Sequence, residues 1–366
     1  MKTERILIIG AGHGGYTAAA DLLLAGFQVS MYELPEYQRN LFPMIESGRI
    51  KLTGEKQGFV TIPRIEAQLD QAMRQAELIL IMTHAQAHAR IAELMAPHVR
   101  QEQAIVLVPG YTGGALCFEQ IFNRLGVKKG YLLAETNTLP YASRKITDES
   151  AVHMKLYLKK VLLSVFPAKF NTAFLPVFRR LYPNAQLVEN VLETGFNNGN
   201  PVLNVAPVVL NAGRIEYAKG EYYHFQEGVS PAVARVLEQV DEERVLLGRE
   251  LGIKTIPYLE RVIETGYVLT NENWYEMIST SPHLSAKGPD SLAHRYLTED
   301  VPFGLVPWYD FAQERNVRLP LMASLIQLAS ALTGVDYFQE GRKVADMGLV
   351  GMDSVSIRDY LYSGER

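Results

Sequence analysis

The sequence predicts an α/β fold in which an N-terminal doubly wound parallel sheet is followed by a mostly α-helical second domain. Short apolar, β-branched runs alternate with helical stretches up to about residue 136. Beyond Val188, helical periodicity dominates and strand-like runs nearly vanish. The 366 residues also make the chain long for one hydrophobic core. We therefore expect a first domain over residues 1–187 and a second over 188–366, with the break between Tyr182 and Val188.

The first predicted strand leads into a glycine-rich turn. Residues 5–9 are apolar and β-branched, as a buried parallel strand requires, and residues 10–15 read Gly-Ala-Gly-His-Gly-Gly. A helical stretch over 16–26 ends at a glycine, and a second strand over 27–32 ends at Glu33. Strand, glycine turn, helix, strand and terminal acid together predict a Rossmann dinucleotide-binding site.

Each glycine of the turn has its own physical reason. Gly10 permits the tight turn, and Gly12 lets the backbone approach a pyrophosphate. Gly15 lets the helix pack close to the sheet. The helix begins near His13 and Gly14, so its N–H groups and positive end face the phosphates.

Glu33 is the candidate for recognising the ribose. It lies eighteen residues beyond Gly15, near the usual offset of about 20 for the acid that binds the 2′-hydroxyl. A carboxylate accepts hydrogen bonds from that hydroxyl and repels a 2′-phosphate, so we expect NAD to be preferred. NADP stays an alternative, because the nearby Arg39 would meet a 2′-phosphate.

The rest of the first domain follows the same alternation. Its predicted elements are a hairpin over 50–62, an amphipathic helix over 65–76, strands over 78–82, 104–108 and 131–136, and helices over 85–95 and up to 125. In such sheets ligands bind beyond the carboxyl ends of the strands. We therefore expect Thr83, Pro109, Gly110 and Glu135 to join the glycine turn around the cofactor. In the second domain, residues 231–251, 256–268 and 318–333 read as helices.

Composition excludes several other classes of protein. A net charge of −4 and a pI near 6.1 give no basic footprint for nucleic acid or an anionic membrane. No apolar run approaches the roughly 20 residues of a membrane span, and the first strand leaves no room for a signal peptide. One cysteine, Cys117, excludes a disulfide framework, and the histidines lack the spacing of metal ligands. We expect a soluble, cytoplasmic, metal-free protein.

The second half holds polar segments that do not look like simple core. Residues 197–201 read Asn-Asn-Gly-Asn-Pro, and a long polar and apolar mixture runs over 288–307. Asp300 lies in a run that otherwise looks buried. A carboxylate in such a run needs a partner or a chemical role.

These segments, taken with the glycine turn, resemble the opine dehydrogenases, most closely the bacterial N-(1-carboxyethyl)-norvaline dehydrogenase branch. The similarity keeps its order and spacing from the glycine turn to Gly341-Arg342-Lys343. The matching stretches are residues 109–116, 135–136, 188–192, 210–212, 227–228, 295–296, 299–301 and 304–307.

The resemblance implies a reductive condensation. An amino acid and a 2-oxo acid form an imine, and NAD(P)H delivers hydride to its carbon. It also implies two domains with the substrate in the cleft between them, a homodimer formed through the helical domain, and a His–Asp pair as acid and base. The aspartate of that pair corresponds to Asp300.

The family histidine is absent here, since its place falls on Asn204. An amide accepts and donates hydrogen bonds but does not exchange a proton near neutral pH. General acid–base help is typically about 10²–10⁴-fold. Two alternatives therefore stay open. The same scaffold would reduce a 2-oxo acid to a hydroxy acid, or the protein would bind a dinucleotide with little catalysis.

Other residues are candidates for the remaining roles. The histidines that would replace the missing one are His84, His224, His283 and His294. His294 stands beside Arg295 in the Asp300 segment and is the strongest of them, its alternative being a surface histidine. Arg295 and Asn200 are the candidates for binding substrate. A guanidinium grips a carboxylate bidentately, whereas the alternative for Arg295 is a salt bridge to Glu299 or Asp300.

Overall fold

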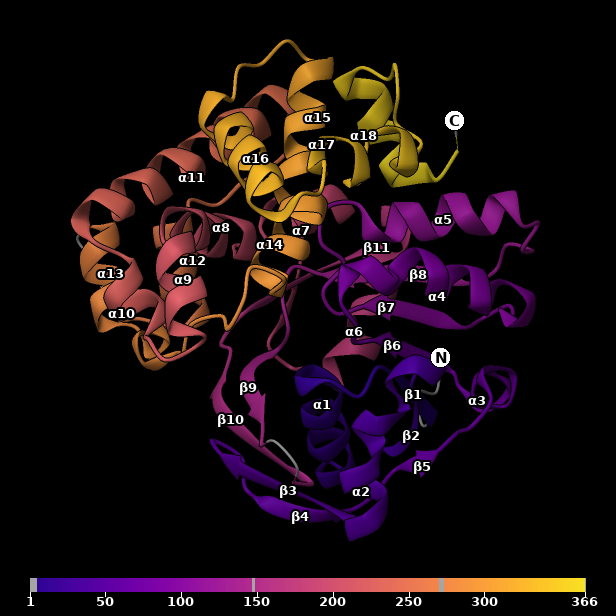
Figure 1. Ribbon diagram of the computed structural model, residues 1–366. Coiled ribbons are helices and arrows are strands. Elements are labelled where there is room, and N and C mark those ends of the chain that lie inside the picture. Colours follow the sequence, from indigo (N-terminus) through magenta and orange to yellow (C-terminus); the bar gives the residue numbers. More distant parts are fainter. Residues whose placement is uncertain (1–4, 147–148, 270–272, 366) are drawn as a thin grey trace. The chain divides into compact units, whose positions relative to one another are not determined.

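The structure is a computed structural model that describes residues 5–146, 149–269 and 273–365 (Figure 1). The chain divides into two compact units, residues 1–194 with 358–366, and residues 195–357. The division falls after Thr194 instead of at residue 187, and the last nine residues belong to the first unit. They do so because the Tyr360 ring packs 5.2 Å from that of Phe166 and its hydroxyl accepts a 3.1 Å hydrogen bond from Gln120.

The first unit is built on a mostly parallel sheet, which confirms the predicted α/β class. Six neighbouring strands run parallel, β11 is antiparallel to β8, and β12 is parallel to β11. In sheet order the strands are β12 (Ala185–Leu187), β11 (Val161–Phe166), β8 (Leu132–Thr136), β7 (Ala104–Leu107), β6 (Leu78–Ile81), β1 (Arg5–Ile9), β2 (Gln28–Tyr32) and β5 (Arg64–Ile65).

A second, smaller sheet belongs to the same unit. Its order is β4 (Gly58–Thr61), β3 (Arg49–Gly54), β10 (Ala151–Tyr157) and β9 (Tyr141–Lys145). Strands β3 and β4 form the predicted hairpin, and β3 pairs in parallel with β10. The sequence did not predict β9 and β10, because both carry charged residues and β10 alternates only weakly between buried and exposed positions.

Helix α1 (His13–Leu24) lies between the two sheets (Figure 1). It contacts β1 and β2 of the large sheet and β3, β4, β9 and β10 of the small one. Every residue from Gly14 to Leu22 is consequently buried, and small side chains such as those of Ala18–Ala20 fit this double cover. The backbone N–H of Lys145 in β9 donates to Nδ1 of His13 at 3.0 Å, so the small sheet also fixes the start of α1.

Further helices connect the strands of the first unit. They are η1 (Pro35–Leu41), α2 (Phe42–Ser47), α3 (Leu69–Gln75), η2 (Ala85–Ala87), α4 (His88–Met95), η3 (Ala96–His98), α5 (Gly114–Arg124), η4 (Ala168–Phe170) and α6 (Asn171–Arg179). Two helices that follow the last strand, α7 (Val191–Phe196) and α18 (Ser354–Ser363), belong only partly to this unit. The helix expected over 65–76 begins only at Leu69, because the preceding residues pair with β2 as β5.

The second unit is helical, as predicted, and α8 lies at its centre. Helix α8 contacts α10, α11, α14, α16 and η6. The helices are α8 (Asn200–Leu210), α9 (Ala212–Ala218), α10 (His224–Gly228), α11 (Pro231–Leu251), α12 (Tyr258–Thr265), α13 (Trp274–Thr280), η5 (Pro282–Ser285), α14 (Arg295–Thr298), the π-helical η6 (Val301–Leu305), α15 (Val306–Glu314), α16 (Pro320–Thr333), α17 (Tyr337–Glu340) and η7 (Ala345–Met347). The expected helices over 231–251, 256–268 and 318–333 correspond to α11, α12 and α16.

A buried arginine ties several of these helices together. Arg244 of α11 is 1% exposed and forms an ion pair with Asp241. Its guanidinium also donates to the carbonyl oxygens of Phe196 and Ile256, at 2.5 and 2.7 Å. A buried charge is tolerated when its donors are satisfied in this way. Arg244 thus holds the segments before α8 and α12 onto α11.

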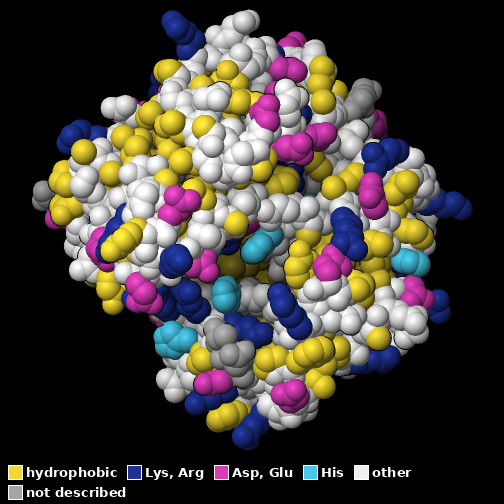
Figure 2. Space-filling model, in the orientation of Figure 1, with side chains coloured by type: hydrophobic (Ala, Val, Ile, Leu, Met, Phe, Trp, Pro, Cys, Tyr) yellow, Lys and Arg dark blue, Asp and Glu magenta, His cyan; other side chains and the backbone are white. Residues whose placement is uncertain are grey.

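The surface agrees with the weak net charge of −4. On the face drawn in Figure 2, basic and acidic side chains are interspersed. Within the described ranges, no single helix combines the length and hydropathy of a membrane span. A pair of segments over 320–333 and 337–347, bent by 111°, meets both criteria only when taken together.

Candidate active site

The glycine turn after β1 has the geometry that its sequence predicts. Gly10 has a φ of +109°, and a Cβ there would lie 2.9 Å from Thr83 Cγ2. A Cβ on Gly15 would overlap the carbonyl of Gly10, so only glycine allows α1 to start this close to the turn. Gly12 caps α1 without a side chain, and a Cβ there would meet no described atom within 4 Å. The turn therefore opens onto space at Gly12 and is closed at Gly10 and Gly15.

Glu33 lies at the end of β2 and holds this turn in place. Its side chain is 5% exposed, and its Oε2 accepts a 2.8 Å hydrogen bond from the Ala11 backbone N–H. Oε1 accepts the N–H of Leu34 at 2.9 Å, and the Asn40 amide lies 3.4 Å from Oε2. A carboxylate has about four acceptor sites, so a ribose hydroxyl can add a further bond. Ribose binding by Glu33 stays a prediction.

Thr83 follows β6 and lies against Gly10. Its hydroxyl Oγ1 is buried and has no hydrogen-bond partner among the described residues. A buried hydroxyl without a partner costs roughly 1–3 kcal/mol, so such groups mark places where a ligand completes the bonding. The structure thus brings Thr83 beside the glycine turn, as its place at the end of a strand predicts.

The loop after β7 is organised around Glu135. This residue ends β8, is fully buried, and its Oε2 accepts the Ala115 backbone N–H at 2.8 Å while Oε1 accepts the Thr194 hydroxyl at 2.6 Å. A Cβ on Gly110 would overlap the same carboxylate, and the peptide before Pro109 is cis. Glu135 therefore fastens the loop to the start of α5. Cofactor contacts of Pro109, Gly110 and Glu135 stay predictions.

Lys145 is a site residue that the sequence reasoning missed. Its ammonium lies 4.0 Å from the centre of the Tyr16 ring and donates to the Asn40 carbonyl at 2.8 Å. The backbone of the same residue binds His13, so a positive charge stands beside the start of α1. Lys145 lies in strand β9, and a prediction of this strand would have indicated it, but the sequence pattern does not predict β9.

In the second unit, Asn204 and Asp300 form a buried polar pair. The Asn204 Nδ2 donates a 2.8 Å hydrogen bond to Asp300 Oδ2. Asn204 is 4% exposed and Asp300 has no exposed surface. An ionised carboxylate only accepts hydrogen bonds, so the amide must present its nitrogen to Asp300. The two residues that the resemblance assigns to acid–base chemistry are therefore in direct contact.

The backbone around Asp300 is shaped to reach α8. Asp300 immediately precedes the π-helical turn η6, and a Cβ on Gly304 of that turn would overlap the ring of Pro201 in α8. π-Helical turns occur mostly at functional sites. The Gly304 backbone consequently packs directly on the first turn of α8, one turn before Asn204.

Arg295 forms the salt bridge to Glu299 that was predicted as the alternative to substrate binding. Its Nη1 lies 3.0 Å from Glu299 Oε2, and the Arg295 side chain is about one third exposed (32%). Glu299 is buried, so the pair orients the guanidinium along α14. Substrate binding by Arg295 stays a prediction.

The candidate histidines have other contacts. His294 caps α14, where its Nδ1 accepts the Tyr296 N–H at 3.3 Å and its ring packs 4.4 Å from the Tyr296 ring. His224 is fully buried, and the centre of its ring lies 5.0 Å from the centre of the Tyr296 ring. His84 is exposed after β6, and the His283 side chain lies outside the described residues. A catalytic role for His294 stays a prediction.

Asn200 is the first residue of α8, and its backbone N–H donates a hydrogen bond to Asn198 Oδ1 at 3.0 Å. Its contact with substrate stays a prediction.

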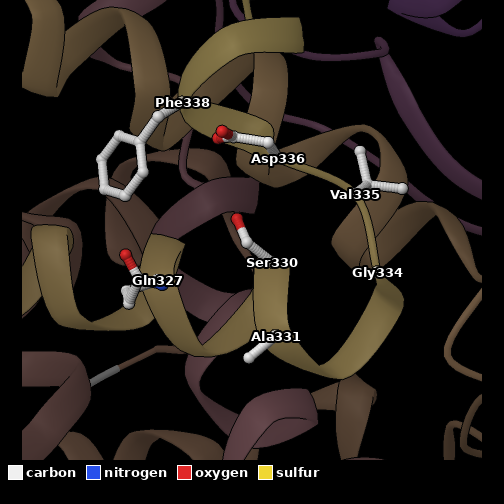
Figure 3. Close-up of a pocket in the computed structure, with 7 residues that line it drawn as sticks. All are labelled: Gln327, Ser330, Ala331, Gly334, Val335, Asp336 and Phe338. Atoms are coloured by element: carbon white, nitrogen blue, oxygen red, sulfur yellow. The ribbon is translucent and has the colours of Figure 1, made fainter.

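A surface pocket of about 390 Å³ lies where α16 ends, and Figure 3 shows the side chains around it. Its lining is Gln327, Ser330, Ala331, Gly334, Val335, Asp336 and Phe338. It contains none of the predicted site residues. No group of three or more metal-ligating side chains occurs in the described parts of the chain.

The fold and the glycine turn define a protein of the nucleotide-dependent dehydrogenase class with an added helical unit. The family described as NAD/NADP octopine/nopaline dehydrogenase, alpha-helical domain, matches residues 187–333. An opine dehydrogenase of Arthrobacter sp. (strain 1C) is 29% identical over 360 residues, covering 98% of this chain and 99% of the relative. A vitopine synthase of Allorhizobium ampelinum is 26% identical over 370 residues, with 98% and 99% covered.

A solved structure extends the likeness to three dimensions. Octopine dehydrogenase in complex with NADH and agmatine superposes with a TM-score of 0.76 at 20% identity, covering 100% of this chain and 99% of the other. The chain is thus similar to opine dehydrogenases over nearly its whole length, and to the helical domain of that family over residues 187–333. The expected resemblance is therefore confirmed.

The residues of the glycine turn fit the dinucleotide that this family uses. Open space at Gly12, the partnerless Thr83 hydroxyl and the Glu33 carboxylate face the position that a nucleotide takes in this fold. Gly10, Gly12, Gly14 and Gly15 with His13 would hold the pyrophosphate, and Glu33 the ribose.

We predict that Thr83→Val separates stability from nucleotide binding. Valine removes a hydroxyl that has no described partner, so the thermal midpoint of the free protein stays the same or rises. The dissociation constant for NADH, followed by its fluorescence, rises by roughly five- to tenfold. Thr265→Val is the control, because the Thr265 hydroxyl donates to the Arg261 carbonyl at 3.0 Å. That variant loses stability with unchanged NADH binding. Unchanged NADH binding by Thr83→Val would contradict the assignment.

Proposed function

We propose that this protein is an NAD(P)H-dependent opine dehydrogenase that joins the amine of an amino acid to the carbonyl carbon of a 2-oxo acid. The observation that carries the proposal is the 2.8 Å hydrogen bond between Asn204 and Asp300. These are the positions that the resemblance assigns to the acid–base pair. Similarity to the family supports the reaction class, and the solved octopine dehydrogenase complex with NADH supports the cofactor.

The nucleotide is bound by the first unit. When bound, the reduced nicotinamide supplies the hydride. Glu33 favours the 2′-hydroxyl of NAD over the 2′-phosphate of NADP, while the exposed Arg39 in η1 keeps NADP as the alternative. The ammonium of Lys145 adds a positive charge beside the phosphate-binding turn.

Asp300 is the residue that moves protons in this proposal. An amino acid enters as an ammonium ion and must lose a proton before its nitrogen attacks the carbonyl carbon of the 2-oxo acid. A buried carboxylate takes that proton and returns it to the departing water as the imine forms. Asn204 holds one oxygen of Asp300 in place through its Nδ2, which leaves its own Oδ1 to accept a hydrogen bond from the nitrogen of the substrate.

The replacement of histidine changes the charge of the pair. An imidazolium beside Asp300 would bring one positive charge, whereas the amide of Asn204 brings none. A protonated amine or imine brings that charge itself, because each carries it on nitrogen. The pair therefore suits a nitrogen-containing substrate better than the neutral carbonyl of a 2-oxo acid alone.

Two other functions follow from Asn204. Without a histidine the site would reduce a 2-oxo acid directly to a hydroxy acid, or it would bind the dinucleotide with little turnover. Carboxylate binding by Arg295, a contact of Asn200 with substrate, homodimer formation and a cytoplasmic location are also part of the proposal. The substrates are an amino acid and a 2-oxo acid, and nucleic acid, membrane and metal have no place in it.

The proposed reaction is tested by NADH oxidation over a matrix of amino acids and 2-oxo acids, repeated with NADPH. We expect turnover that requires both an amine and a 2-oxo acid, with a higher kcat/KM for NADH. Turnover with the 2-oxo acid alone would establish the hydroxy-acid reaction instead. Nucleotide binding without turnover in any combination would contradict catalysis.

We predict that Asn204→His raises opine formation and adds an ionisation to the pH–rate profile. The imidazole would hydrogen-bond to Asp300, whose negative charge favours the imidazolium, so its pKa lies at or above the usual value of about 6.5. The protonated form donates a proton to departing water, so the gain is lost as pH rises through that pKa.

The control for this variant is Asn204→Gln, which adds volume but no titrating group. Because position 204 is only 4% exposed, both variants are expected to lose roughly 1–3 kcal/mol of stability by overpacking. A histidine variant that is no faster than the glutamine variant, with the same pH profile, would show that the chemistry needs no proton donor at residue 204.

A further inference from the structure

A buried arginine that forms no ion pair with a carboxylate of the described residues lies at the start of α8. Arg261 of α12 is 6% exposed, and its Nε and Nη1 make no hydrogen bond within the described parts of the chain. A buried charge costs several kcal/mol unless another group compensates it.

The guanidinium is held in a fixed place by its surroundings. Gly199 is the residue before α8, and a Cβ there would overlap both Arg261 Nη2 and the Tyr258 ring. The Arg261 Cζ lies 5.3 Å from the centre of the Tyr258 ring, which stacks on Trp274 at 5.1 Å. Gly199 thus allows the guanidinium to reach the N-terminal end of α8.

The aromatic hydroxyls beside Arg261 bring no counter-charge. Burial raises the pKa of Tyr258 well above its usual value, and burial also raises that of Tyr267. The positive charge of Arg261 opposes both shifts without cancelling them. Both phenols are therefore protonated and neutral at pH 7.

Arg244 shows what a structural arginine looks like in the same unit. It is 1% exposed, and its donors meet Asp241 and the carbonyl oxygens of Phe196 and Ile256. Arg261 is almost as deeply buried, but beyond a hydrogen bond with the Tyr258 hydroxyl its Nε and Nη1 meet no acceptor in the described residues. The contrast indicates that the acceptor for Arg261 comes from outside the chain.

A second donor next to Arg261 points to the same kind of ligand. Asn198 is 1% exposed, and its Nδ2 has no hydrogen-bond partner in the described residues, while its Oδ1 accepts the Asn200 N–H at 3.0 Å. The groups left over are therefore donors, and both residues lie beside Gly199 at the N-terminal, positive end of the 11-residue helix α8. An arginine with further N–H donors in a dry site is typical of carboxylate recognition.

We propose that Arg261, Asn198 and the N-terminal end of α8 form a binding site for a carboxylate of the substrate. The assignment of that carboxylate to an amino acid or a 2-oxo acid rests on the proposed function. Asn204 lies five residues after Gly199, about 7.5 Å along the helix axis. The proposed carboxylate site and the Asn204–Asp300 pair thus both contact helix α8.

The site is tested with Arg261→Met, using Arg244→Met as the matched control. Methionine fills the space of the arginine stem and removes the charge, so Arg261→Met leaves the thermal midpoint of the free protein unchanged or higher. Arg244→Met lowers it, because it breaks a satisfied network. A destabilised Arg261→Met protein would assign Arg261 a structural role and overturn the proposal.

Ligand binding is measured by calorimetry on the full chain with NADH, which does not depend on turnover. The probes are pyruvate against pyruvamide, and L-arginine against agmatine, each pair differing in one carboxylate. We expect Arg261→Met to weaken the binding of one carboxylate-bearing probe about 10- to 100-fold and to leave the binding of its counterpart without that carboxylate unchanged. Arg261→Lys restores part of the affinity.

The two arms identify the source of the carboxylate. Loss confined to pyruvate assigns the site to the 2-oxo acid, and loss confined to L-arginine assigns it to the amino acid. If amine-dependent NADH oxidation occurs while Arg261→Met binds both probes normally, the carboxylate site is wrong and the proposed function stands. If carboxylate binding depends on Arg261 but no condensation occurs, the site stands and the proposed function fails.

Discussion

The hydrogen bond from Asn204 to Asp300 joins residues 96 positions apart in the chain, and the arrangement of the helical unit serves it. Helix α8 brings Asn204 to the centre of the unit, where α10, α11, α14 and α16 surround it. The π-helical turn after Asp300 reaches α8 because Gly304 has no side chain to hold it away from Pro201. The Asp300 carboxylate is thereby buried beside the neutral amide of Asn204. The chemistry that we propose depends on this neutral partner.

The charges of Asp300 and Arg261 are opposite in sign, and both residues belong to the helical unit. The helical unit has the amide of Asn204 beside Asp300, in place of a histidine that can carry a positive charge. It also has the buried guanidinium of Arg261 at the N-terminal end of α8. An amino acid carries both complementary groups, an ammonium nitrogen and a carboxylate. Helix α8 is thus contacted by the Asp300 carboxylate at Asn204 and by the Arg261 guanidinium beside Gly199.

The sequence was sufficient for the parts that depend on local pattern. The glycine turn, Glu33 and the parallel strands were predictable, because strand–turn–helix patterns restrict the backbone to few conformations. In the small sheet only the hairpin of β3 and β4 was predictable. Strands β9 and β10 were not, since β10 pairs with a strand about 100 residues away, and Lys145 was missed with them. Arg261 carries no sequence signal at all. Its significance lies in the acceptors that are absent around it in the described structure, and only the packed helices disclose that.

The central claim is that hydride reaches the carbon of an imine and not of a free carbonyl. The most direct measurement is mass spectrometry of the product formed from an amino acid, a 2-oxo acid and NADH carrying deuterium at the transferred position. The account predicts a secondary amine with one deuterium on the carbon derived from the 2-oxo acid. A deuterated hydroxy acid, with the amino acid recovered unchanged, would contradict it.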